Sequence, residues 1–235
     1  MKNLTWQNPE QLFVAQVLIN KVKSKCCGIK DNYKLYTMAE DSSPRLMIDN
    51  SDNDGHAETM MDYIISWTLR CAVDNSCVGK PILMKQCKKI LCKLIGIDEP
   101  HVVEVMNVET WKQDQYIDLW VHVELVIDGK AESHAILIEN KYYTGLHDAT
   151  DDDGVRRNQL LVYRKRFDKY YETQEKEWVR HYCLITCIER EEPEKFEKYL
   201  VAHDYGYKIF TFYELLGENV EYTESDIYNE FWLRW

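Results

Sequence analysis

Two apolar segments joined by a tight turn constrain the fold of this chain more than any other feature. Residues 116–120 and 136–141 are rich in β-branched and aromatic side chains, which predicts two β-strands. Asp128-Gly129, between them, is a strong signal for a two-residue hairpin turn. The sequence therefore predicts an antiparallel hairpin.

A tight turn also fixes which residues face each other across the hairpin. If Ile127 pairs with Lys130, Asp118 lies opposite Glu139. Two like charges directly opposite each other destabilise a sheet unless a cation lies between them. The pairing therefore predicts a site for a divalent metal ion.

The same reasoning extends to the preceding segment, which reads as a β-rich run from His101 to Trp111. If the next turn has Gln113-Asp114 at its tip, Glu109 pairs with Asp118 and joins the acidic row. This expectation depends on the register, since a slip of one residue moves a side chain to the other face of the sheet.

The order of these residues resembles the PD-(D/E)XK nuclease superfamily, which has the restriction-endonuclease-like fold. That pattern is an Asp in one strand, Glu-x-Lys in the next and Gln-x-x-x-Tyr in a following helix. The matching residues are Asp118, Glu139-Asn140-Lys141, Gln159 and Tyr163. The resemblance covers residues 101–170 and a strand at 179–188. The alternative is a surface hairpin with a Glu–Lys ion pair, followed by a basic amphipathic helix.

The resemblance implies a metal-dependent nuclease that hydrolyses phosphodiester bonds, most often in DNA. Mg²⁺, or Mn²⁺ in its place, would be held by Asp118, Glu139 and the backbone carbonyl of Asn140. Lys141 would orient or help deprotonate the attacking water and offset phosphate charge. The resemblance also brings Gln159 and Tyr163 close to the active site. They could instead form a buried hydrogen-bonded pair with no catalytic role.

Two further acidic residues are candidates for the metal. Glu109 corresponds to an acidic residue on the preceding strand of the family, and the register argument also brings it to the site. It could equally be an exposed strand carboxylate. Glu58 corresponds to a helix Glu that family members present to the metal, but a Glu in a first helical turn is favoured by the helix dipole anyway.

Charge is distributed unevenly along the chain. The net charge of −11 counts against a protein that coats nucleic acid, because phosphate binding needs positive charge. A basic stripe between 155 and 170 nevertheless predicts phosphate contacts, for which the candidates are Arg156, Arg157 and Arg166. A solvated helix face is the ordinary meaning of such a run.

Composition indicates one soluble domain. The 235 residues suffice for a substantial core, with residues 1–96 mainly helical and 101–211 carrying the sheet and the site. The eight cysteines contain no Cys-x-x-Cys pair, which favours buried free thiols over a metal site. With no apolar run that could cross a membrane and no signal-peptide pattern, we expect a cytoplasmic protein.

The expected order of elements gives an α/β or α+β fold, with a mixed central sheet flanked by helices. Helices are predicted at 9–25, 57–73, 81–95, after residue 155, at 192–202 and at the C-terminus. Strands are predicted in the three segments above and at 179–188 and 207–211, and loops at 28–55 and 144–154.

Three functions compete at this point. The first is the nuclease, with DNA as its partner. The second is a catalytically silent module that keeps the fold and binds nucleic acid or protein. The third is a defence or toxin component whose nuclease is restrained by a partner. The sequence leaves open whether a protein partner or a second copy of the chain takes part.

Overall fold

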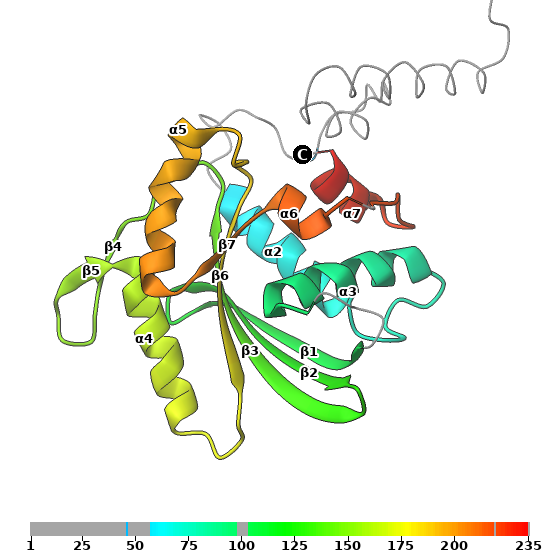
Figure 1. Cartoon of the computed structure of the whole chain (residues 1–235), viewed down its shortest axis with the longest axis horizontal. Helices are drawn as coiled ribbons and strands as arrows, with labels where there is room; N and C mark the ends of the chain where they lie inside the picture. The colour runs from blue at the N-terminus through cyan, green and yellow to red at the C-terminus, as the bar shows by residue number, and fades with distance from the viewer. Residues whose placement is uncertain (1–45, 47–56, 98–102, 219, 235) are drawn as a thin grey trace, which may run out of the picture. The chain divides into compact units, whose positions relative to one another are not determined.

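The computed structural model describes residue 46 and residues 57–97, 103–218 and 220–234 (Figure 1). The helix expected at 9–25 and the loop expected at 28–55 lie outside the described residues.

A five-stranded sheet forms the centre of the structure, in the order β1-β2-β3-β6-β7. The first three strands are antiparallel neighbours, whereas β3, β6 and β7 run parallel, so the sheet is mixed. The expected mixed sheet flanked by helices is thereby confirmed. The strands are β1 (Val103–Asp114), β2 (Ile117–Ile127), β3 (Lys130–Lys141), β6 (Val179–Thr186) and β7 (Lys208–Thr211).

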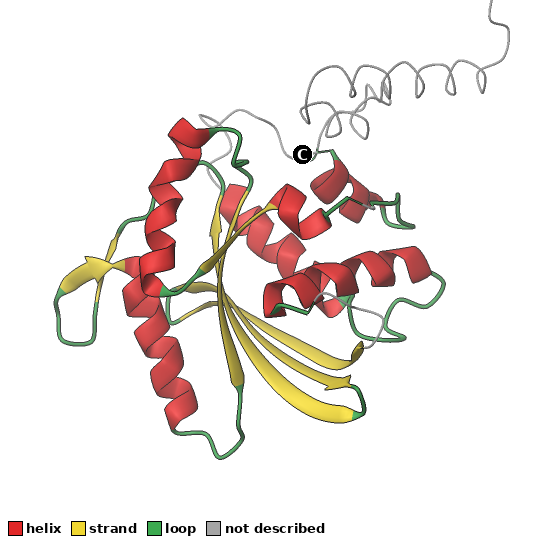
Figure 2. Cartoon of the chain, viewed as in Figure 1, coloured by secondary structure: helices red, strands yellow, loops and turns green. Residues whose placement is uncertain are grey.

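Helices cover both faces of this sheet (Figure 2). The helix α4 (Gln159–Glu172) lies on one face, and α2 (Ala57–Arg70) and α3 (Pro81–Ile95) lie on the other (Figure 1). The middle of β3 is buried on both faces, as expected for a strand between two helical layers. The predicted end of α3 is confirmed, because Gly96 caps the helix with a φ of 79°.

Short elements complete the described chain. The predicted loop at 144–154 contains β4 (Asp148–Thr150), which pairs with β5 (Arg156–Asn158) in a separate two-stranded sheet. The helix expected at 192–202 is one turn of α-helix followed by 3₁₀-helix. The remaining elements are α5 (Pro193–Phe196), η3 (Glu197–Tyr205), α6 (Phe212–Leu216), α7 (Asp226–Tyr228) and η4 (Asn229–Leu233).

The register between β2 and β3 is the one that the Asp128-Gly129 turn predicts. Ile127 pairs with Lys130, and the ladder continues to Leu119 opposite Ile138. The ladder ends at that pair, one residue before Asp118 and Glu139, so the predicted pairing of these two acids is not part of it.

The register between β1 and β2 differs from the prediction. Asp114 pairs with Ile117, so the tip of the turn is Gln115-Tyr116 and not Gln113-Asp114. Both tip residues have positive φ, 50° and 70°, as a two-residue hairpin turn of type I′ requires.

Candidate functional site

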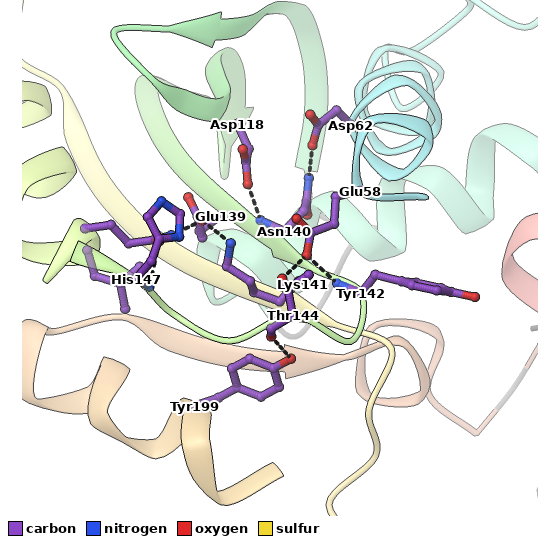
Figure 3. A network of polar contacts seen from close by, with 12 residues as sticks. Glu58, Asp62, Asp118, Glu139, Asn140, Lys141, Tyr142, Thr144, His147 and Tyr199 are labelled. Atoms are coloured by element: carbon purple, nitrogen blue, oxygen red, sulfur yellow. Dashed lines mark hydrogen bonds and ion pairs between the residues drawn. The ribbon is translucent and has the colours of Figure 1, made fainter. Parts of the chain in front are cut away.

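Polar side chains gather where β2 begins and β3 ends, between α2 and α4 (Figure 3). Asp118, the second residue of β2, is held by two donors. The backbone N–H of Asn140 donates to its Oδ2 at 2.9 Å, and Gln113 Nε2 lies 3.4 Å from its Oδ1. Burial raises the pKa of Asp118, although the hydrogen bond from Asn140 opposes that shift.

Glu139 is the most deeply buried acid of this group, with 2% of its surface exposed. Its Oε1 lies 2.8 Å from Lys141 Nζ and also accepts a hydrogen bond from Gln159 Nε2. Its Oε2 is buried without a hydrogen-bond partner among the described residues. Burial, and then the charge of Asp118, raises the pKa of Glu139 to about 8.

Lys141 is the buried cation beside these acids (Figure 3). Burial alone would lower its pKa, but the carboxylates of Glu139, Glu58 and Asp118 outweigh burial and raise it. The ammonium group therefore stays protonated in the arrangement described.

Helix α2 contributes two acids to the site from one face, four residues apart. Glu58 Oε1 accepts hydrogen bonds from Tyr142 N at 3.0 Å and from the hydroxyl of Thr144. Asp62, which the sequence reasoning missed, accepts from Asn140 Nδ2 at 2.7 Å. Burial, and then Asp118, raises the pKa of Asp62 to about 7. Its spacing from Glu58 is the signal that could have found it.

Asn140 links the two acidic groups through its donors. Its backbone N–H binds Asp118 and its side-chain amide binds Asp62, while its side-chain Oδ1 is buried without a hydrogen bond to any described residue. In the structure, Asn140 makes these contacts through its backbone N–H and its side-chain amide. The resemblance implied a different role, in which its backbone carbonyl binds the metal.

Helix α4 brings Gln159 to the site. Its side chain donates to Glu139 and accepts from the backbone N–H of His147 at 3.1 Å, so it connects β3 to the segment that follows it. Tyr163 is buried one turn along α4, and burial, followed by the charges of Glu139 and Asp118, raises its pKa to about 12. The side chains of Gln159 and Tyr163 form no hydrogen bond with each other in the described structure.

Glu109 does not join the acidic row, and the predicted pairing of Glu109 with Asp118 is wrong. The structure pairs Glu109 with His122. Because the turn lies two residues further along than expected, Gln113 occupies the place opposite Asp118. Glu109 is exposed and lies beside Asn107, with Asn107 Nδ2 3.4 Å from its Oε1.

The three candidate arginines lie on two elements. Arg156 and Arg157 belong to β5, so the helix expected after residue 155 does not include them, and α4 begins at Gln159 with Asn158 as its N-cap. Arg157 Nε lies 2.6 Å from Asp151 Oδ2. Arg166 Nε lies 3.4 Å from Asp152 Oδ1, and its Nη2 donates to the carbonyl of Thr150 at 2.9 Å.

The donor set can be tested against the Mg²⁺ that the resemblance implies. No group of three or more His, Cys, Asp or Glu side chains among the described residues is arranged to hold a metal ion. Mg²⁺ needs fewer protein ligands, since it binds through one or two carboxylates and keeps several waters. Asp118 and the unpaired Oε2 of Glu139 meet that requirement, and a cation there would satisfy a buried oxygen that otherwise costs free energy.

Comparisons with known proteins give no match to this chain among protein-family models, curated proteins or solved structures. In the part of the chain that the structure describes, no helix is both long enough and apolar enough to cross a membrane.

Proposed function

We propose that this chain is a metal-dependent nuclease of the PD-(D/E)XK type with a restriction-endonuclease-like core. The observation that carries the proposal is the meeting of Asp118, Glu139, Lys141 and Gln159 at one end of the sheet. They come from β2, β3 and α4, in the order that the resemblance requires. A surface hairpin with an exposed ion pair would not bury Glu139 and Lys141 together.

In this proposal, the residues that meet at the site each have a role in phosphodiester hydrolysis. A bound Mg²⁺ would supply a Lewis acid and lower the pKa of an attacking water. Asp118 and Glu139 would hold it. Gln159 fixes the orientation of Glu139, and the N–H of Asn140 fixes that of Asp118. Lys141, kept protonated by its acidic neighbours, acts as a hydrogen-bond donor to the water and offsets the charge of the phosphate.

One observation favours the second candidate, a silent module that keeps the fold. The acidic loop between β4 and β5 pairs with Arg157 and Arg166, two of the three cations expected to contact phosphate. A surface whose cations are already neutralised binds nucleic acid weakly. The nuclease remains the function that the buried site supports better.

Cleavage by purified variants tests the nuclease. Wild-type protein is incubated with plasmid, linear duplex and single-stranded DNA in the presence of Mg²⁺ or Mn²⁺. We expect cleavage that falls at least about a hundredfold in Lys141→Ala and Glu139→Gln, because both remove groups that act on the transition state. Lys130→Ala, at the exposed start of β3, and Glu109→Gln, on the exposed face of β1, are matched controls that should keep activity.

Calorimetry with Mn²⁺ separates the nuclease from the silent module. A site that is lost in Asp118→Asn, together with cleavage, supports the nuclease. Absence of both Mn²⁺ binding and cleavage in the folded wild type, or undiminished cleavage by Lys141→Ala, would overturn it.

A further inference from the structure

One side of the acidic site reaches the surface at Gln113, near the end of β1. The side-chain Nε2 of Gln113 lies 3.3 Å from Asp62 Oδ2 and 3.4 Å from Asp118 Oδ1, and the residue itself is exposed. The exposed side chains around this point are therefore among the first that a substrate of the site meets.

Two exposed tyrosines lie next to these acids in the chain, and each has a cation beside its ring. Tyr63, with 57% of its surface exposed, directly follows one acid on α2, and Tyr116, with 74% exposed, lies two residues before the other, in the turn between β1 and β2. Lys112 Nζ lies 3.2 Å from the centre of the Tyr63 ring, and Arg166 Cζ lies 5.6 Å from the centre of the Tyr116 ring. We call these four residues the aromatic rim.

The backbone of Tyr116 adopts a conformation that is unfavourable for its residue type. Its φ is 70°, in the left-handed region that favours Gly and Asn, whereas the turn between β2 and β3 uses Asp128-Gly129. Arg166 Nη1 donates to the carbonyl of Gln115 at 3.4 Å and so supports the turn from α4. An exposed ring gains little from burial that would offset the strain. Strain of this kind gathers at functional positions, where it is part of the function.

We propose that the aromatic rim binds single-stranded DNA, with Tyr63 and Tyr116 stacking on unpaired bases. Proteins that bind single strands combine aromatic side chains, which stack on the bases, with nearby cations, which attract the backbone. In a duplex the bases stack on one another and are closed to an exposed ring, so the rim fits a single strand better. The inference rests on the proposed function, which brings a DNA phosphate to the acids beside the rim.

The charge of the chain makes stacking the main source of affinity at the rim. The net charge is −11, and Arg166 already pairs with Asp152, so the attraction of phosphates is weak. Stacking on a tyrosine needs no net positive charge and strengthens binding by about tenfold per base. We therefore expect binding that depends on the bases more than on the backbone.

An abasic strand separates contacts with bases from contacts with the backbone. The full chain is titrated, in a chelating buffer that prevents cleavage, into a labelled oligothymidylate of about 12 nucleotides and into an abasic strand with the same phosphates. Fluorescence anisotropy gives both affinities. We expect the wild type to bind the intact strand at least about tenfold more tightly than the abasic strand.

Variants connect this preference to the two rings. Tyr116→Gly removes the ring at a φ that suits glycine, so the turn is retained, and the preference for the intact strand should fall at least about threefold. Tyr63→Ala should lower the preference in the same way, whereas Tyr116→Phe keeps the ring and should keep the preference. Tyr222→Ala, which removes an exposed tyrosine outside the rim, is the matched control and should bind both strands as wild type does.

Equal binding of the intact and abasic strands by the wild type, or binding of neither, would overturn the inference, as would an unchanged preference in Tyr116→Gly. These measurements do not require cleavage, so they separate the rim from the nuclease. A wild type that cleaves DNA but binds both strands equally refutes the rim and keeps the nuclease. Base-dependent binding without metal-dependent cleavage keeps the rim and refutes the nuclease.

Discussion

Burial, more than proximity, sets the proton affinity of the acids at the end of the sheet. It is the largest cause of the raised pKa of Asp62, Asp118 and Glu139, and repulsion between neighbouring carboxylates is a smaller one. A buried carboxylate costs folding free energy unless a cation or several donors stabilise it. Perturbed acids of this kind are typical of functional sites, where residues are held for chemistry at the expense of stability.

Asp62 provides a test of this cost, because its hydrogen bonds come from the uncharged amides of Asn140 and Gln113. We expect Asp62→Asn to increase the free energy of unfolding by about 1 kcal/mol at pH 8 in the absence of divalent ions, since it removes a buried charge beside Asp118. Urea denaturation with a chelator measures the change. The exposed Asp204→Asn serves as the control and should stay within about 0.5 kcal/mol of wild type. A less stable Asp62→Asn would show that the charge stabilises the fold.

Among the elements, the β4–β5 hairpin and α4 hold their charges in ion pairs that are exposed or partly exposed. Asp152 bridges Arg166 at 3.4 Å and Lys169 at 3.1 Å, and Asp151 binds Arg157. Exposed ion pairs contribute little to stability, so their loss should leave the fold intact. Their effect is on the field that an approaching phosphate backbone meets.

Removing an acid that pairs with these basic side chains tests whether α4 and the β4–β5 hairpin contact nucleic acid. We expect Asp152→Asn to bind a labelled DNA oligonucleotide about fivefold more tightly at low salt, with the gain shrinking as salt rises, because freed cations release more counterions from DNA. Fluorescence anisotropy in a chelating buffer measures binding without cleavage. Asp148→Asn, on the same hairpin, removes the same charge but neither ion pair described above. If DNA affinity rises equally in both variants, the change in net charge explains the effect, and the result gives no support for a DNA-contacting surface on α4 and the hairpin.

The two hairpins also show what a sequence can predict at this scale. The register of β2 and β3 was predictable because Asp128-Gly129 signals one turn type. The register of β1 and β2 was not, because Gln115 and Tyr116 take positive φ without the Gly or Asn that marks such turns. The acids Asp118 and Glu139 were found because they interrupt apolar strands.

The remaining contributors to the site depend on tertiary packing. Gln113 reaches Asp118 only through the shifted turn, and Asp62 reaches Asn140 only because α2 packs across the end of the sheet. Gln113 carries no local signal of its contact, and the spacing of Asp62 from Glu58 places it on the face of Glu58 without indicating its contact with Asn140. The pairing of Arg157 with Asp151 likewise depends on a β4–β5 hairpin that the sequence presented as a loop.

For the molecule as a whole, the central sheet also holds a pair of histidines, of which His134 is buried and His181 is half-buried. His134 on β3 is buried, and its Nδ1 lies 2.9 Å from His181 Nε2 on β6, while its Nε2 lies 3.0 Å from Glu132. Burial, with smaller contributions from His134 and Lys208, lowers the pKa of His181 to about 4. The sheet therefore folds with His181 neutral.

Because the folded protein keeps His181 neutral, its free energy of unfolding depends on pH. The unfolded chain binds a proton at this residue below about pH 6.5, whereas the folded protein does so only near pH 4. Stability from this group is therefore complete above pH 6.5 and is lost as the pH falls toward 4, with a slope of at most about 1.4 kcal/mol per pH unit. The buried acids have raised pKa values, so their effect on stability runs in the opposite direction as the pH falls. The effect of His181 is therefore measured as the difference in stability between wild type and a His181 variant, in which the contribution of the acids cancels.

We expect His181→Gln to gain stability relative to wild type as the pH falls from 6.5 to 4, because Gln can replace the hydrogen bond to His134 but cannot take up a proton. Urea denaturation of both proteins at several pH values gives the difference in unfolding free energy, which should shift steadily in favour of the variant as the pH falls. The exposed His147→Gln is the matched control and should run parallel to wild type. A constant difference between wild type and His181→Gln across this window would show that the pair does not couple the stability of the sheet to protons.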